Sequence, residues 1–278
     1  MKTKNLKSLY IVLTALSIMA FVAGCKKDKD TANEDFQSEG LDIAQTEDIS
    51  TGIDNTIEEA FELHGSGSME RNSEPLGNHE LGCGSVTTDS ATGTMTITFN
   101  NCIGPNGHVR NGQIIITSHN GGYWDPGASW DVTFNNFTID GNPVTGSRHV
   151  ENVGPASNGM TWNITASLTF TRPDATYRTW SSTRTRQLTQ GYGDSIRTNN
   201  IYVINGTAAH ADTRSGRSAN ITITNITRDL SCAYITAGSL NVVPSNRPAR
   251  LIEFGNGACD DIATVTKNGV THIIHLHP

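Results

Sequence analysis

Residues 160–171 read MTWNITASLTFT, and an apolar residue alternates with a polar one throughout this stretch. Successive side chains of a β-strand point to opposite faces, so the spacing places every apolar side chain on one face. The same alternation recurs over residues 95–99 and 130–134. The pattern predicts long strands with one buried and one solvated face.

The boundaries of these strands are marked by turn residues. The apolar parity shifts after Phe134 to Phe137 and Ile139, which predicts a β-bulge at Asn135 or Asn136. Asn-Gly pairs favour tight hairpins because both residues tolerate positive φ. Examples of such pairs lie at residues 106–107, 111–112, 205–206 and 268–269. We therefore expect residues 83–278 to form one all-β domain, an antiparallel sandwich or a large twisted β-meander of about a dozen strands.

The N-terminus has the features of an export signal. Three lysines lie within the first seven residues, an apolar run covers residues 9–22, and Ala23 and Gly24 precede Cys25. A charged start, a short apolar stretch and small residues before a cleavage point are typical of a secretory signal peptide. A membrane-spanning helix needs about 20 apolar residues, which is more than this run offers. We expect residues 1–24 to be a signal peptide and Cys25 to begin the mature chain.

Two short motifs resemble those of exported bacterial lipoproteins. Val22-Ala23-Gly24-Cys25 resembles the lipobox, which implies that Cys25 carries acyl chains such as palmitate and anchors the protein to a membrane. Residues 26–30 resemble the export tag of Bacteroidetes surface lipoproteins, although Lys29 separates the two acids. The resemblance implies an outer-membrane protein on the cell surface. If the run is only a charged spacer, the periplasmic face is the alternative.

Acidic residues are concentrated between the anchor and the β domain. Residues 26–82 contain 15 acidic and 4 basic residues, whereas residues 83–278 contain 12 acidic and 13 basic ones. Such a segment is typical of a solvated linker, so we interpret residues 25–82 as an anchor and acidic tether. Within it, apolar side chains recur every four residues and predict a short amphipathic helix over about Ile53–His64. The stripe consists of Ile49, Ile53, Ile57 and Phe61, with Glu58, Glu59 and Glu62 opposite.

The β domain contains four cysteines, Cys83, Cys102, Cys232 and Cys259. An even number in an exported chain indicates disulfides, and the absence of a Cys-x-x-Cys spacing argues against a zinc site. If bonded cysteines face each other across a hairpin, the turn lies midway between them. The midpoint is at residues 92–93 for Cys83 and Cys102, and at residues 245–246 for Cys232 and Cys259. Both positions are credible turns, so we predict the bonds Cys83–Cys102 and Cys232–Cys259.

A further resemblance covers most of residues 83–278. The segment CIGPNG at residues 102–107, residues 110–115 and the ending GACDDIATV at residues 257–265 are similar to a family of uncharacterised Bacteroidetes lipoproteins. The resemblance supports the compartment and the β fold. It implies no particular activity.

One strand carries an unusual set of side chains with the same parity, Arg178, Trp180, Arg184 and Arg186, which we call the Arg/Trp ladder. Guanidinium and indole groups projecting from one face can bind acidic glycans or stack on sugar rings. We therefore predict a ligand surface here. The alternative is an edge strand kept soluble by its charges.

No catalytic residues stand out. There is no Gly-x-Ser-x-Gly, His-Glu-x-x-His or phosphate-binding loop. His275 and His277, and the pair Asp260-Asp261, are possible metal ligands, but a complete ligand set is not apparent, so we predict no metal or cofactor. The nearly neutral β domain argues against nucleic acid as a partner.

These features favour a non-enzymatic, membrane-anchored binding module for a glycan or a protein partner. The alternatives are a hydrolase of polysaccharide or peptidoglycan and a structural component of the cell envelope. A cleft with two inward carboxylates would favour the hydrolase.

Surface display can be tested by protease treatment of intact cells. We expect the β domain to be lost, because exposed linkers are the preferred sites of cleavage. Complete protection until the cells are lysed would contradict surface display. Replacing Asp28 and Asp30 with Ala should protect the domain if the export tag is recognised, and should change nothing if the run is a spacer.

Overall fold

The computed structural model describes residues 27–64, 80–156, 159–193 and 196–277. The predicted signal peptide, Cys25 and Lys26 lie outside these ranges, whereas residues 27–30 of the export tag lie in the first helix. The chain divides into two compact units, Met1–Glu39 and Gly40–Pro278. The second unit contains every described strand and the part of helix α2 that begins at Gly40.

Helix α2 is the first element and spans Lys27–His64. A short 3₁₀-helix, η1, occupies Arg197–Asn199. The strands are β1 (Ser85–Asp89), β2 (Thr94–Ile103), β3 (Val109–Asn120), β4 (Ser129–Ile139), β5 (Asn142–Ala156), β6 (Gly159–Thr171), β7 (Tyr177–Gln190), β8 (Ile201–Asp212), β9 (Arg217–Asp229), β10 (Ala237–Pro244), β11 (Arg250–Asn256), β12 (Ile262–Lys267) and β13 (Val270–His275).

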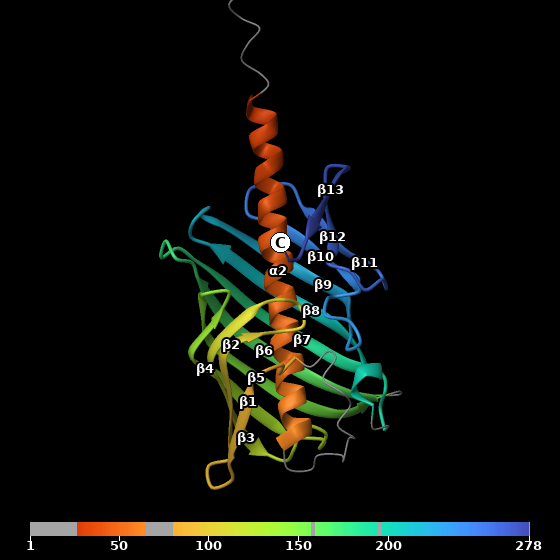
Figure 1. The fold of residues 1–278 in the computed structure, drawn as a ribbon. Coiled ribbons are helices and arrows are strands. Elements are labelled where there is room, and N and C mark those ends of the chain that lie inside the picture. The colour runs from red at the N-terminus through yellow and green to blue at the C-terminus, as the bar shows by residue number, and fades with distance from the viewer. Residues whose placement is uncertain (1–26, 65–79, 157–158, 194–195, 278) are drawn as a thin grey trace, which may run out of the picture. The chain divides into compact units, whose positions relative to one another are not determined.

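These strands form one antiparallel sheet in which each strand pairs with its neighbours in the sequence, from β1 to β13. The all-β prediction is confirmed, and of its two forms the meander is the one observed. The sheet curves so that one face lies against residues 40–64 of α2 (Figure 1). The inner face is therefore the face toward α2, and the outer face is the opposite one.

The predicted alternation of buried and exposed residues is confirmed. In β6, Trp162, Ile164 and Leu168 are buried while Asn163, Thr165 and Ser167 are not. Alternating burial of this kind keeps the apolar side chains on the inner face.

Two predicted Asn-Gly turns are wrong. Asn111-Gly112 lies within β3 and Asn205-Gly206 within β8, both at shifts of the strand register.

The predicted bulge lies in β4. Its pairing with β3 shifts register between Asn135 and Thr138, and Asn136 has a φ of 48°. The next turn also follows its sequence. Asp140 and Gly141 both have positive φ between the paired residues Ile139 and Asn142, as a two-residue type I′ hairpin requires.

Both predicted disulfides are confirmed. Cys83 is bonded to Cys102 and Cys232 to Cys259, with Cα–Cα distances of 5.3 and 5.6 Å. The hairpins between the bonded cysteines turn close to the predicted positions. Asp89 pairs with Thr94 around the first turn, and Val242 pairs with Arg250 around the second.

The prediction of a solvated tether is wrong for residues 40–64. The helix is much longer than the expected turns after Ile53, and its acidic side chains are buried along with its apolar ones. The buried acids in this part are Glu47, Asp48, Asp54, Glu58, Glu59 and Glu62. The reason is charge complementarity with the inner face of the sheet, described below. In the described part of the chain, no helix is both long and apolar enough to cross a bilayer.

Replacing Cys232 and Cys259 together with Ala should lower the free energy of unfolding by about 3 kcal/mol, because the bond closes a loop of 27 residues. Urea denaturation under non-reducing conditions measures this. With dithiothreitol added, the wild type loses the same bond, so this pair's contribution should disappear. An undiminished difference under reduction would mean that side-chain packing, and not the cross-link, causes the loss.

Candidate functional site

The Arg/Trp ladder is on the inner face, and most of it is covered. The exposed fractions of Trp180, Arg184 and Arg186 are 0%, 2% and 2%. Strand β7 also pairs with β6 and β8 along its length, so it is not an edge strand. The prediction of an exposed ligand surface is therefore wrong for these three residues. Arg178, at the start of the strand, is only partly covered and is considered separately.

The buried arginines bind the acidic side chains of α2. Arg184 donates to Glu47 Oε1 at 3.0 Å and to Asp54 Oδ2 at 3.1 Å. Arg148 of β5 donates to the other oxygen of Asp54 and to the Ser50 carbonyl oxygen, the latter at 2.8 Å. Two guanidinium groups thus pair with two carboxylates that lie about two turns apart on the helix.

A second cluster surrounds Glu58. Arg186 donates to Glu58 Oε2 at 2.6 Å, and the Tyr202 hydroxyl donates to Glu58 Oε1 at 2.5 Å. The Arg186 guanidinium also lies 3.6 Å from the center of the Tyr202 ring. A planar guanidinium can pair with a carboxylate and stack on an aromatic ring at once, which a lysine ammonium cannot do.

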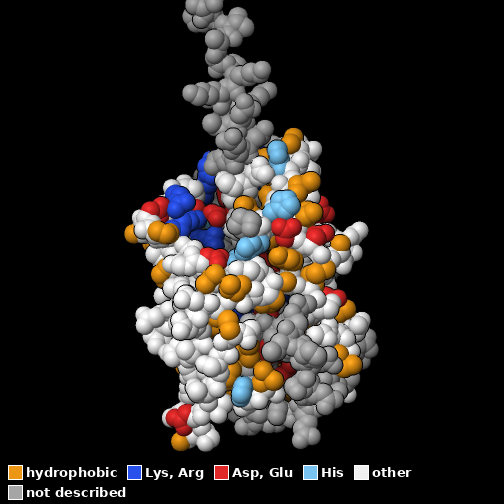
Figure 2. Space-filling model, viewed as in Figure 1, with side chains coloured by type: hydrophobic (Ala, Val, Ile, Leu, Met, Phe, Trp, Pro, Cys, Tyr) orange, Lys and Arg blue, Asp and Glu red, His pale blue; other side chains and the backbone are white. Residues whose placement is uncertain are grey.

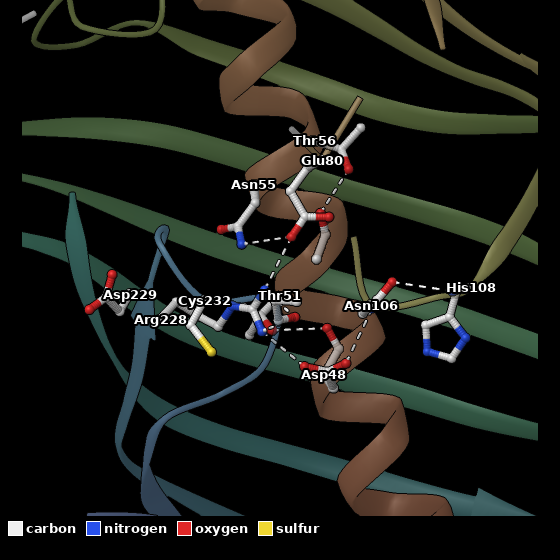
Figure 3. A network of polar contacts seen from close by, with 12 residues as sticks. Asp48, Thr51, Asn55, Thr56, Glu80, Asn106, His108, Arg228, Asp229 and Cys232 are labelled. Atoms are coloured by element: carbon white, nitrogen blue, oxygen red, sulfur yellow. Dashed lines mark hydrogen bonds and ion pairs between the residues drawn. The ribbon is translucent and has the colours of Figure 1, made fainter. Parts of the chain in front are cut away.

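A third cluster joins distant strands across the helix (Figure 3). Arg228 of β9 donates to Asp48 at 2.9 Å and to Glu80 at 3.2 Å, and Asn106 of the β2–β3 loop donates to the other Asp48 oxygen at 3.5 Å. Glu80 also accepts from Arg110 of β3 at 3.3 Å. Elements from both halves of the sheet therefore meet at the same part of α2.

Burial changes the proton affinity of these acids. It raises the pKa of Glu47 from 4.5 to about 7, because loss of solvation outweighs the attraction of Arg184. Burial also raises the pKa of Asp48, although Arg228 opposes the change. The inner face is thus an internal ion-pair network and not an open site.

An open cleft remains where α2 meets the ends of β4, β6 and β7. Arg178 lies here and donates to Asp42 Oδ1 at 2.9 Å. Arg172 donates to the second oxygen of Asp42 at 2.9 Å and to Asp212 at 2.9 Å. The cleft has a volume of about 280 Å³. Of the predicted ligand residues, only Arg178 faces it.

The lining of this cleft combines planar polar groups with apolar ones. Opposite the arginines, His108 Nδ1 lies 2.5 Å from Asp140 Oδ2. Figure 2 shows basic, acidic and histidine side chains gathered on the upper half of one face. The polar lining residues are Asp42, Gln45, His108, Asp140, Asn142, Thr171, Arg172 and Arg178, and the apolar ones are Ile49, Ile139, Phe170 and Pro173.

The remaining candidate residues are not brought together in one described site. His275 pairs with Asp261 at 3.0 Å on the outer rim, whereas His277 packs on His108 with ring centers 5.0 Å apart. The cleft residues were not found from the sequence because they come from α2 and three separate hairpin ends. The shared parity of Arg172 and Arg178 was the one available signal.

Comparison with known proteins gives no further guidance, since no family model, curated protein or solved structure matches this chain.

The raised pKa of Glu47 predicts a pH-dependent stability. The carboxyl binds a proton more tightly in the folded state, so its contribution is fully present below pH 4.5 and is lost as the pH rises toward about 7. Relative to the wild type, Glu47→Gln should therefore gain stability over this interval, by up to about 1.4 kcal/mol per pH unit. Chemical denaturation at several pH values measures it.

The exposed Glu253 offers a matched control. The difference between Glu253→Gln and the wild type should not vary with pH in this way. A constant difference for Glu47→Gln as well would show that Glu47 is ionised throughout the interval and fully compensated by Arg184.

Proposed function

We propose that this protein is a lipid-anchored envelope lipoprotein whose β domain is a non-enzymatic module that binds a neutral glycan in the cleft next to Arg178. The anchor is Cys25, and the cell surface is the compartment that the lysine-and-acid run favours. The proposal rests on one observation above all, the mixture of guanidinium, carboxylate and amide groups in a single open cleft.

These groups suit sugar hydroxyls. A hydroxyl both donates and accepts hydrogen bonds, so carboxylates, amides and guanidinium groups around one ring can satisfy several of them. Asp42, Asn142 and Arg178 supply one group of each kind from α2, β5 and β7. The ion pairs of Asp42 with Arg172 and Arg178 hold these side chains in place before a ligand arrives, which lowers the entropic cost of binding.

Charge and size narrow the ligand class. The two arginines are matched by Asp42 and Asp212, so the cleft has no excess of positive charge for a polyanion. A volume of about 280 Å³ is near the lower limit of about 300 Å³ for small-molecule sites. We infer that the cleft takes the end of a glycan, one or two sugar rings, and not a long internal stretch.

A hydrolase is the second candidate, because Asp42 and Asp140 are two carboxylates in one cleft and Asp140 orients His108. In this arrangement Asp42 already binds two guanidinium groups. Asp140 already accepts from the Val109 backbone N–H at 2.9 Å in addition to its contact with His108. Both carboxylates are therefore committed to structural partners, which favours binding over catalysis.

Glycan binding is tested with a panel of neutral, uronic-acid and sulfated oligosaccharides and the full chain. We expect neutral members to bind and to be recovered intact. Arg178→Gln should weaken binding by about tenfold, or 1.4 kcal/mol, because it removes a charged hydrogen-bond donor. Asn142→Ala should weaken binding by a smaller factor. Titration calorimetry measures the affinities, and chromatography of the recovered sugars detects cleavage.

Asn220→Ala provides the control, because Asn220 lies in a separate hollow on the outer face. It should leave the affinity unchanged. Loss of binding in this variant alone would place the site on the outer face. Preferential binding of sulfated oligosaccharides would contradict the assignment of a neutral ligand. Recovery of shortened sugars would favour the hydrolase.

A further inference from the structure

Three ligand-type side chains converge on the outer face of the sheet, away from the helix. His119 of β3, Asp131 of β4 and His149 of β5 come from adjacent strands, and Asp131 and His149 are direct register partners. His119 is the extra residue where the pairing of β3 with β4 shifts between Ser118 and Asn120. The topology therefore brings three separate chain segments to one point.

The ligand atoms of these residues face one another. His119 Nε2 lies 2.8 Å from Asp131 Oδ2, and His149 Nδ1 lies 2.7 Å from Asp131 Oδ1. All three ligand atoms lie within 4.8 Å of one another. Among the residues that the structure describes, no other such group of three His, Cys, Asp or Glu side chains converges.

We propose that His119, Asp131 and His149 form a binding site for a divalent transition metal ion, and we take Zn²⁺ as the ion to be tested. Two imidazole nitrogens and one carboxylate oxygen are ligands typical of Zn²⁺, whereas Ca²⁺ and Mg²⁺ prefer oxygen alone. Tetrahedral Zn²⁺ with bonds of about 2.0–2.1 Å requires its ligand atoms to be about 3.3 Å apart. Small side-chain rotations bring the three atoms to that spacing.

The surroundings allow this adjustment. The side chains of His119, Asp131 and His149 are 47%, 49% and 50% exposed, so they are free to rotate and the fourth coordination position is open to water. Of the residues two positions from Asp131 or His149 on the same face, Ser129, Thr133 and Ser147 are uncharged and Glu151 is acidic. No cation next to the carboxylate on these strands competes with the metal. The proposed site is independent of the glycan cleft.

Zinc binding is measured by titrating ZnCl₂ into the full chain, purified in detergent and freed of metal by a chelator. We expect one Zn²⁺ per chain at this site. His119→Gln, Asp131→Asn and His149→Gln should each weaken binding by about tenfold or more, since each removes one of three protein ligands. Millimolar Ca²⁺ or Mg²⁺ should not displace Zn²⁺, whereas Ni²⁺ should compete.

His275→Gln is the matched control, because His275 is an equally exposed histidine paired with a single carboxylate, Asp261. It should bind Zn²⁺ like the wild type. Thermal unfolding of every variant checks that the fold is retained. We expect it to be retained, because these side chains are exposed. The proposal would be overturned if the wild type bound no Zn²⁺, if His119→Gln and His149→Gln kept wild-type affinity, or if His275→Gln weakened binding as much as they do.

Discussion

The pairing of acidic side chains on α2 with arginines on the inner face of the sheet is the interaction on which the rest of the structure depends. A helix that carries buried carboxylates at Glu47, Asp54 and Glu58 would be strongly disfavoured next to an apolar surface. Here Arg148, Arg184 and Arg186 supply the opposite charges. The sheet in turn could not bury those arginines without the helix. The helix and the sheet therefore each provide the opposite charges that allow the other to be buried.

Buried ion pairs of this kind contribute more to specificity than to net stability. The cost of removing both charges from water roughly cancels their attraction, whereas leaving one charge without its partner is expensive. A shift of α2 by one residue would rotate its carboxylates by about 100° away from their arginines. The network therefore selects one register of the helix on the sheet. The apolar stripe of Ile53 and Ile57 alone would select it less sharply.

The sequence predicted those features that depend on neighbouring residues. Strand alternation, the bulge at Asn136 and the turn-based cysteine pairing all follow from local spacing, and the structure has each of them. The inner-face network could not be predicted in this way, because its arginines lie 94 to 180 residues from their partners on α2 and charge is normally a sign of exposure. Trp180 was interpreted wrongly as part of a ligand surface, since a tryptophan with the same parity as Arg184 and Arg186 indicates a covered face.

The cleft near Arg178 was beyond prediction for a related reason. It forms only where one part of α2 meets several hairpin ends, and no single segment carries its pattern. The outer cluster of His119, Asp131 and His149 was missed because it needs the exact order of β3, β4 and β5 and the register between them. A meander assigned from the sequence alone leaves that register open.

The order of the elements along the chain has a kinetic consequence. Helix α2 precedes every strand that the structure describes, yet its partners Arg148, Arg184 and Arg228 follow it by 94 to 180 residues. Contacts between such distant residues form slowly, since a long loop must close before they stabilise anything. The helix is synthesised before these strands, but its ion pairs are completed only after they have formed. Until β9 is in place, this acidic segment has no complete binding surface, so a chain that stops short of β9 lacks part of the core that its own N-terminal helix requires.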